Sequence, residues 1–240
     1  MRMINRLSFL AAGLTLAACA TTTPPTTEPA VELKPGTAWV AAGEGWAEEA
    51  EAVYADASAH VLREAASRPA KSWVVVLDLD ETVINNVAYQ VSREELGESY
   101  TPESWYAWTQ QEAATLVPGV AAFLDRVNAA GGHVAFVTNR SDREQLATEN
   151  NLAALGLVRG EDFRVLLTRA RPDGESAKDA RYRLVPQMLA VQGYPGTEII
   201  AYVGDNIGDK PAEPGAWQFF CIDQGEMYGS PCAAVPGPGR

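Results

Sequence analysis

The feature that most constrains the fold is an apolar run, Trp73 to Leu77, that ends in the acidic segment Asp78-Leu79-Asp80-Glu81-Thr82. A short run of Val and Leu without polar interruption predicts a buried strand of a parallel sheet. The acids would then emerge at the carboxyl end of the strand, where open α/β sheets bind ligands. Two neighbouring carboxylates can serve as nucleophile and proton donor, although Asp followed by Glu-Thr also fits an ordinary helix N-cap.

Two later apolar stretches end in the same way. Val134 to Val137 runs into Thr138-Asn139-Arg140, and Ile199 to Val203 runs into the segment Gly204 to Asp209. Parallel strands point in one direction, so the three polar clusters are expected to converge on one edge of a sheet, with helical crossovers between the strands. Taken alone, the last segment fits a plain glycine-containing turn. Considered together with the first acidic segment, the segment Gly204 to Asp209 predicts part of a site.

This succession of motifs resembles the haloacid dehalogenase superfamily of phosphohydrolases. The four motifs of that superfamily map onto Asp78 with Asp80, Thr138, Lys178, and Asp205 with Asp209. Within it, the chain is most similar to the bacterial class C nonspecific acid phosphatases, the lipoprotein kind that includes 5'-nucleotidases, over roughly residues 70 to 230. The resemblance implies an α/β fold with a Rossmann-like core, a parallel sheet flanked by helices, and a small, mainly helical cap inserted at residues 85–117.

The resemblance also implies the roles of individual residues. Asp78 would attack phosphorus and Asp80 would act as general acid and base, while Thr138 and Lys178 would hold and neutralise the phosphoryl group. Lys178 also fits a solvated residue at the start of a helix, expected over residues 178–192. Mg²⁺ is the implied cofactor, because it prefers hard oxygen ligands. Its implied ligands are the Asp78 side chain, the Asp80 backbone carbonyl and Asp205, with Asp209 in or beside the ligand set.

Substrate contacts are predicted for Asn139 and Arg140. In the family that the chain resembles, aromatic side chains at the positions of Trp105 and Tyr228 sandwich the organic part of the substrate, often a nucleotide base. The spacing of Trp105 and Trp108 also fits simple packing of a small helix onto the body of the protein.

The implied activity is that of an acid phosphatase that hydrolyses small phosphate monoesters, such as nucleoside monophosphates and aryl phosphates, through an aspartyl phosphate. One alternative is a non-catalytic outer-membrane surface lipoprotein, and another is a phosphotransferase or sugar phosphatase of the same superfamily. A binding protein could dispense with Asp80 or Lys178, yet both motif positions are filled.

The N-terminal region predicts export. Arg2 and Arg6 precede an apolar stretch that ends at Ala18, too short to span a bilayer and typical of a secretory signal. The junction Leu16-Ala17-Ala18-Cys19 resembles the bacterial lipobox, which predicts lipidation of Cys19; an ordinary signal peptide with a chance cysteine is the alternative. Ala20 favours the outer membrane by the sorting rule of such lipoproteins. The predicted location is therefore the bacterial cell envelope, with a lipid anchor in the membrane.

The predicted organisation follows from these motifs and from composition. A lipoprotein signal peptide occupies residues 1–18. A Thr/Pro-rich tether, which begins with the lipidated Cys19, occupies residues 19–38. The phosphatase domain covers residues 39–233, and a Pro/Gly-rich tail covers residues 234–240.

Composition excludes several classes of function. Without residues 1–18, the chain has 17 basic and 31 acidic residues, a net charge of −14, which repels nucleic acid polymers and favours a small phosphate drawn in by a local cation. His60 and His133 are the two histidines, and both are predicted to be structural. Histidine-nucleophile phosphatases, Ser-His-Asp hydrolases and His-rich dinuclear metallophosphatases are therefore excluded. Cys221 and Cys232 fit either a disulfide of an exported protein or buried free thiols.

Overall fold

The computed structural model describes residues 31–171, 174–229 and 232 of the 240. The predicted signal peptide, Cys19, the first part of the tether and the C-terminal tail lie outside these residues. Within the described ranges, no helix combines the length and the apolar character that crossing a bilayer requires.

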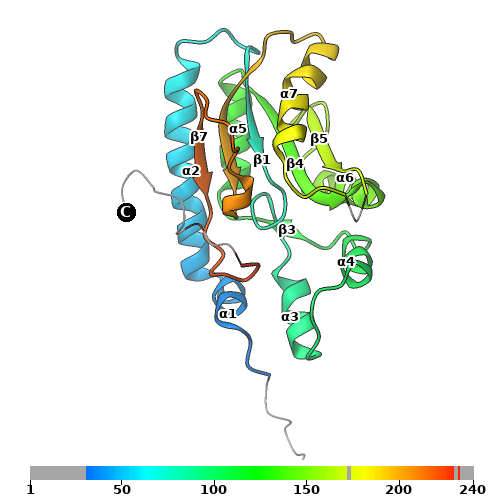
Figure 1. Cartoon of the computed structure of the whole chain (residues 1–240). Coiled ribbons are helices and arrows are strands. Elements are labelled where there is room, and N and C mark those ends of the chain that lie inside the picture. Colours follow the sequence, from blue (N-terminus) through cyan, green and yellow to red (C-terminus); the bar gives the residue numbers. More distant parts are fainter. Residues whose placement is uncertain (1–30, 172–173, 230–231, 233–240) are drawn as a thin grey trace, which may run out of the picture. The chain divides into compact units, whose positions relative to one another are not determined.

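A five-stranded parallel sheet forms the centre of the fold (Figure 1). In spatial order its strands are β5 (Val165–Arg169), β4 (His133–Ser141), β1 (Trp73–Leu77), β6 (Glu198–Gly204) and β7 (Gln218–Cys221). The three strands predicted from their polar ends are therefore immediate neighbours, with β1 paired in parallel to β4 on one side and to β6 on the other. The parallel sheet and the α/β class predicted from the sequence are confirmed.

Helices cover both faces of this sheet. They are α2 (Glu44–Ala65), α5 (Val120–Ala129), α6 (Gln145–Ala154) and α7 (Asp179–Val191). Successive residues of a strand point to opposite faces, so Val75 and Leu77 of β1 join the core cluster with α2 and α5, whereas Val74 and Val76 join the cluster with α7. Each of these fully buried side chains contributes about 1.5–3 kcal/mol relative to an exposed one. Burial on both faces explains why β1 has no polar residue.

The sequence predicts a helix over residues 46–66 from apolar residues at helical spacing, namely Trp46, Ala50, Val53, Tyr54, Ala57 and Val61. The long helix α2 begins two residues before this range and ends one residue before its end. Five of the six apolar residues that follow the predicted helical spacing are buried, and Val53 is half-buried. Its spacing of apolar residues at intervals of three and four therefore marks the face that packs on the sheet.

The insertion after β1 forms a small cap beyond the carboxyl edge of the sheet (Figure 1). It consists of β2 (Ile84–Asn85), α3 (Val87–Glu95), α4 (Pro102–Thr109) and β3 (Thr115–Leu116), with β2 and β3 paired antiparallel. The Thr101 side chain accepts the Ser104 N–H, and the Ser104 hydroxyl accepts the Thr101 N–H, which is a capping box at the start of α4. The small, mainly helical insertion expected after the first strand is therefore present, and its elements span residues 84–116.

The first described helix, α1 (Pro35–Ala42), corrects one predicted boundary. It begins inside the stretch predicted as a tether, residues 19–38, so the folded domain starts before residue 39. Pro35 suits the first turn of a helix, because proline lacks the N–H that would stay unpaired there. Glu94 of α3 then holds the helix: it accepts the Lys34 N–H and the Thr37 hydroxyl, each at 2.8 Å.

Short 3₁₀ turns complete the structure at η1 (Asp142–Glu144) and η2 (Ile207–Asp209). The two histidines lie apart from the acidic segments, as predicted. His60 Nε2 is 3.0 Å from the Ile200 carbonyl oxygen, and buried His133 packs on the Tyr194 ring with 4.3 Å between ring centroids. Burial lowers the pKa of His133 to about 4, so it is a neutral core residue at physiological pH.

Candidate active site

The carboxyl ends of β1, β4 and β6 bring the predicted polar clusters to one edge of the sheet. Asp78 directly follows β1, and its N–H donates to the Val203 carbonyl oxygen of β6 at 2.9 Å. Asp205 directly follows β6, while Thr138 lies within β4. These three residues are 60 to 127 positions apart in the chain. The parallel pairing of their strands in the sheet is what makes them neighbours.

Three carboxylates form the acidic centre of this edge. Asp78, Asp205 and Asp209 each offer an oxygen, and these oxygens lie within 4.8 Å of one another. The turn η2 places Asp209: Asn206 Oδ1 accepts the Gly208 N–H at 2.8 Å, and Asp209 Oδ2 accepts the Asn206 N–H at 3.1 Å.

Gly204 is required where β6 ends beside this turn. A Cβ atom on residue 204 would lie 2.4 Å from the Cβ of Asp209, which is closer than two carbon atoms can approach. The glycine therefore lets the Asp209 side chain fold back against the strand end.

Lys178 enters the centre from the N-terminal end of α7. Its buried ammonium donates to Asp78 Oδ1 and to Asp209 Oδ1, the latter at 2.6 Å. Burial opposes the charged form of Lys178, but Asp209 and Asp78 outweigh it and raise the pKa of Lys178 above its ordinary value. Lys178 is therefore buried beside Asp78 and is not a solvated residue of the helix face.

The centre carries more negative charge than Lys178 can balance. Burial raises the pKa of Asp78 and of Asp205, and in both cases neighbouring carboxylates add to the rise. Such a set of buried oxygens is stabilised by a cation, and carboxylate oxygens are the ligands that Mg²⁺ prefers. Asp78, Asp205 and Asp209 thus fit a divalent metal ion, as the sequence predicted.

Arg181 organises the segment predicted to receive the phosphoryl group. Its guanidinium donates to the Thr138 carbonyl oxygen, to Asn139 Oδ1 at 2.6 Å and to the Ser176 carbonyl oxygen at 3.1 Å. Thr138 is fully buried, and its hydroxyl oxygen accepts the Arg140 N–H at 3.1 Å. Arg181 therefore ties the end of β4 to the segment that carries Lys178.

Asp80 lies outside the acidic centre and faces the cap. Its carboxylate is paired with Arg140, whose Nη2 is 2.8 Å from Asp80 Oδ1, and it also accepts Asn86 Nδ2 at 2.9 Å. Oδ1 of Asp80 is therefore committed to these partners, which is compatible with the prediction that Asp80 would use its backbone carbonyl toward a metal.

The two predicted aromatic substrate contacts come from different parts of the fold. Trp105, in α4 of the cap, packs edge-on against Tyr89 with ring centroids 5.1 Å apart. Tyr228 follows β7 and is 37% exposed, and its hydroxyl lies near Glu81. Burial and then the charge of Glu81 raise the pKa of Tyr228 well above its ordinary value.

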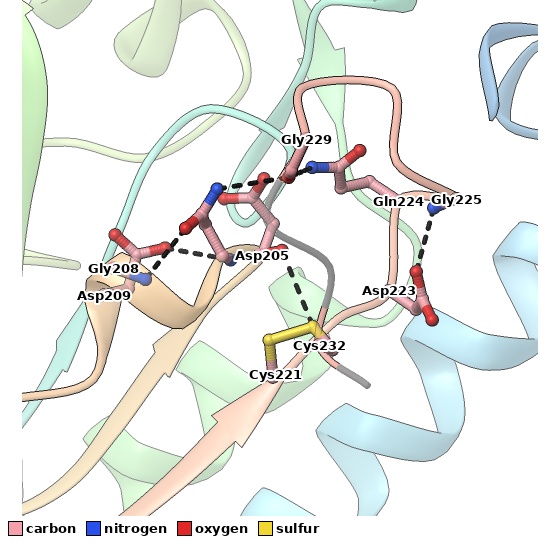
Figure 2. Close-up of a disulfide and its surroundings, with 10 residues drawn as sticks. Asp205, Gly208, Asp209, Cys221, Asp223, Gln224, Gly225, Gly229 and Cys232 are labelled. Carbon is pink, nitrogen blue, oxygen red and sulfur yellow. Dashed lines mark hydrogen bonds between the residues drawn. A yellow bond between two sulfur atoms is a disulfide. The ribbon is translucent and has the colours of Figure 1, made fainter. Parts of the chain in front are cut away.

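A disulfide between Cys221 and Cys232, with 5.6 Å between their Cα atoms, closes the loop that carries Tyr228. Figure 2 shows this bond beside Asp205, whose carbonyl oxygen lies 3.5 Å from Cys232 Sγ. In the same loop the Gly229 carbonyl oxygen accepts the side-chain amide of Asn206 at 3.4 Å. The sequence left open whether Cys221 and Cys232 are bonded or are free thiols, and the structure shows the disulfide. This disulfide anchors the loop next to the acidic centre.

Two residues of the site were missed by the sequence analysis. Glu81 adopts a left-handed backbone with φ of 56°, and its buried carboxylate accepts the Asn86 N–H at 2.6 Å. Burial raises the pKa of Glu81 to about 8, and the charge of Asp80 adds to this rise. Asn86 is fully buried between the two acids. The sequence signal that could have identified them is the third acid after the strand, Glu81, followed five residues later by Asn86.

Comparison with known proteins identifies the family. The family model described as HAD superfamily, subfamily IIIB (acid phosphatase), matches residues 10–230, nearly the whole chain. The chain belongs to this family. Among solved structures, the fold of this HAD-family protein is similar to that of the class C acid phosphatase from Bacillus anthracis with tungstate bound. The TM-score is 0.67 at 22% sequence identity, over 81% of this chain and 84% of the other. A second structure of the Bacillus anthracis enzyme matches with a TM-score of 0.65, at the same identity and coverage. The family resemblance stated from the motifs is confirmed.

Proposed function

We propose that this HAD-family acid phosphatase hydrolyses small phosphate monoesters through an aspartyl phosphate on Asp78, with Mg²⁺ as cofactor. The observation that carries the proposal is that Lys178 forms ion pairs with Asp78 and Asp209 at the carboxyl edge of the sheet, where Asp205 also lies. The Bacillus anthracis relative was solved with tungstate, a tetrahedral oxyanion of the same shape as phosphate, which supports a phosphoryl site in the shared fold.

In the first step, an oxygen of Asp78 would bond to phosphorus as the ester P–O bond breaks, and Asp80 would give its proton to the departing oxygen. In the second step, a water molecule would bond to phosphorus as the bond to Asp78 breaks, and Asp80 would take the proton of the water. Lys178 keeps the Asp78 oxygen aimed and offsets charge on the phosphoryl group. A metal ion held by Asp78, the Asp80 backbone carbonyl, Asp205 and Asp209 would supply charge neutralisation for the phosphoryl oxygens.

The preferred substrates that we propose are nucleoside monophosphates and aryl phosphates, held between Trp105 and Tyr228, with Asn139 as a further candidate for substrate contact. Stacking accepts many ring systems, which favours broad monoester specificity. Initial rates on 5'-AMP, 4-nitrophenyl phosphate, glucose 6-phosphate and glycerol 2-phosphate, with and without an acceptor alcohol, test this proposal. Higher rates on the sugar phosphate, or transfer to the alcohol exceeding hydrolysis, would favour the sugar phosphatase or the phosphotransferase. No hydrolysis of any ester would favour the non-catalytic surface lipoprotein.

Trp105→Ala is expected to raise the KM for 5'-AMP by about tenfold, because stacking of a base on an aromatic ring contributes roughly 1–3 kcal/mol. The KM for glycerol 2-phosphate, which has no ring, should change by less than about twofold. Because Trp105 also lies against Arg140 of the core, kcat and KM are measured separately for each substrate. An equal rise of KM for both substrates would contradict the stacking role.

We also propose that Cys19 anchors the protein to the bacterial envelope, with the outer membrane as the favoured location. Acyl chains contribute about 0.8 kcal/mol for each buried methylene, so two or more chains hold a protein firmly. The full-length chain should partition into the detergent phase of a Triton X-114 extract, and Cys19→Ala should move it to the aqueous phase. Equal partition of both proteins would exclude this anchor.

A further inference from the structure

Arg140 is enclosed by protein rather than directed at an open site. Only 2% of the residue is exposed. Its Nε donates to Asp80 Oδ1 at 2.9 Å, and its Nη2 donates to Asp80 Oδ1 at 2.8 Å and to Asn86 Oδ1 at 3.1 Å. Its Nη1 donates to Thr148 Oγ1 at 3.1 Å. These bonds use the Nε donor, both Nη2 donors and one of the two on Nη1. Little of the guanidinium is left for a phosphate.

The contacts on Asp80 distinguish its two carboxylate oxygens. Oδ1 accepts Nε and Nη2 of Arg140 and also Nδ2 of Asn86, all within 2.9 Å. Among the residues that the structure describes, Oδ2 receives one contact, a longer one of 3.3 Å from Arg140 Nε. Three short donors occupy the lone pairs of Oδ1 and fix the plane of the carboxylate. Oδ2 is therefore the oxygen with capacity to hold and transfer a proton.

Two tryptophans of the cap pack on the groups that hold Asp80. The ring of Trp105 lies over Arg140, with 5.4 Å between the guanidinium carbon and the ring centroid. The indole N–H of Trp108 donates to Asn86 Oδ1 at 2.9 Å. Both tryptophans belong to α4, so the cap covers Arg140, whereas 22% of the Asp80 side chain stays exposed. A guanidinium over an aromatic face in such a place is held more strongly than one in solvent.

We propose that Arg140 is a positioning residue that aims Oδ2 of Asp80 at the leaving-group oxygen, and that it does not bind the phosphate. This inference rests on the proposed function, in which Asp80 is the general acid and base. Arg140 itself neither gives nor takes a proton. When the ester P–O bond breaks, the proton on Oδ2 moves to the departing oxygen, and in the second step a proton of the attacking water returns to Oδ2. Arg140 keeps that oxygen oriented through both steps.

The test compares two leaving groups. The 4-nitrophenolate ion leaves readily without a proton, whereas the alkoxide of glycerol 2-phosphate needs one, so correct aim of the acid matters for the second substrate. In Arg140→Lys and Arg140→Gln, kcat/KM for glycerol 2-phosphate should fall about 10- to 100-fold, and kcat/KM for 4-nitrophenyl phosphate by less than about threefold. Because kcat/KM reports steps up to the aspartyl phosphate, a slower second step does not enter the comparison. Equal losses for both substrates would overturn the inference and assign Arg140 to phosphate binding or to folding.

Arg143 provides a matched control. It stands three residues along the same segment, its guanidinium lies 4.5 Å from the ring centroid of Tyr106, and it donates to the Pro102 carbonyl oxygen at 3.0 Å. It thus joins the core to the cap, as Arg140 does, but its carboxylate partner is Glu144, at 3.5 Å, rather than Asp80. Arg143→Gln should leave both substrates within about twofold of the wild type. If the Arg140 variants fail to fold, Thr148→Val removes only one acceptor of Arg140, and a selective loss on glycerol 2-phosphate decides in favour of the inference; an equal or absent loss decides against it.

Double-mutant analysis separates this inference from the proposed function. Asp80→Asn alone should show the same leaving-group selectivity. If it does not, the acid role of Asp80 fails and the inference about Arg140 fails with it, whereas a selective Asp80→Asn beside an unselective Arg140→Lys overturns the inference alone. If Asp80→Asn is selective, adding Arg140→Lys should cause no further loss on glycerol 2-phosphate, because Arg140 acts through Asp80. A further tenfold loss in the double variant would show that Arg140 acts independently, and the inference would be wrong.

Discussion

Asp78→Asn is expected to abolish turnover, with kcat on 4-nitrophenyl phosphate at least about a thousandfold below wild type, because an amide cannot form the acyl phosphate. Phosphate monoesters react so slowly without a catalyst that residual hydrolysis by bound water would be negligible on the time scale of an assay. The measurement is an initial-rate assay on protein whose thermal midpoint and circular dichroism have been recorded.

The fold should survive this change. Asparagine has the shape of aspartate, and Lys178 keeps its second partner, Asp209, at 2.6 Å. Replacing one of three clustered acids also removes repulsion, so the thermal midpoint should not fall by more than a few degrees. Asp125→Asn, an exposed acid on α5, is the control and should retain full activity. A folded Asp78→Asn protein with more than one tenth of wild-type activity would show that Asp78 is not the nucleophile.

Removal of divalent metal ions is expected to have the second-largest effect, a loss of more than about a hundredfold in kcat/KM that Mg²⁺ restores. Three buried carboxylates share one ammonium at this centre, and a cation is the natural counterion for the remaining charge. The readout that does not depend on activity is thermal unfolding. A ligand that binds only the folded protein stabilises it by about 2.7 kcal/mol at a concentration 100 times its Kd.

Asp205→Asn provides the matched variant for this experiment. It replaces one charged carboxylate of the centre by a neutral amide while leaving Lys178 paired with Asp78 and Asp209. Added Mg²⁺ should raise the thermal midpoint of the wild type and of Asp125→Asn, and it should raise that of Asp205→Asn much less. An identical Mg²⁺ response in all three proteins, or no response in the wild type, would exclude a metal at these carboxylates.

The short-range patterns of this sequence were sufficient to predict most of the core. Strand β1 and its two neighbours were predicted within a few residues, because a doubly buried strand must be apolar along its whole length and must end where polar groups can reach solvent or ligand. Helix α2 followed from its apolar spacing, and α7 was expected to start at Lys178, one residue before it does. Strands β5 and β7 were not predicted; β5 carries Thr168 and Arg169, and β7 is four residues long, so neither has the uninterrupted apolar run of β1.

The candidate site divides in the same way. The sequence by itself determined which residues gather at the sheet edge, since Asp78, Thr138 and Asp205 each stand at or near the end of an apolar strand, where chain position alone sets their place. Only the tertiary structure decided the partners: Asp80 meets Arg140 across 60 positions, Cys221 bonds to Cys232, and Glu81 and Asn86 are buried beneath the cap. Such pairings depend on how the cap folds back over the strand ends. That packing arises from contacts distant in the chain, which leave no periodic trace in the local sequence.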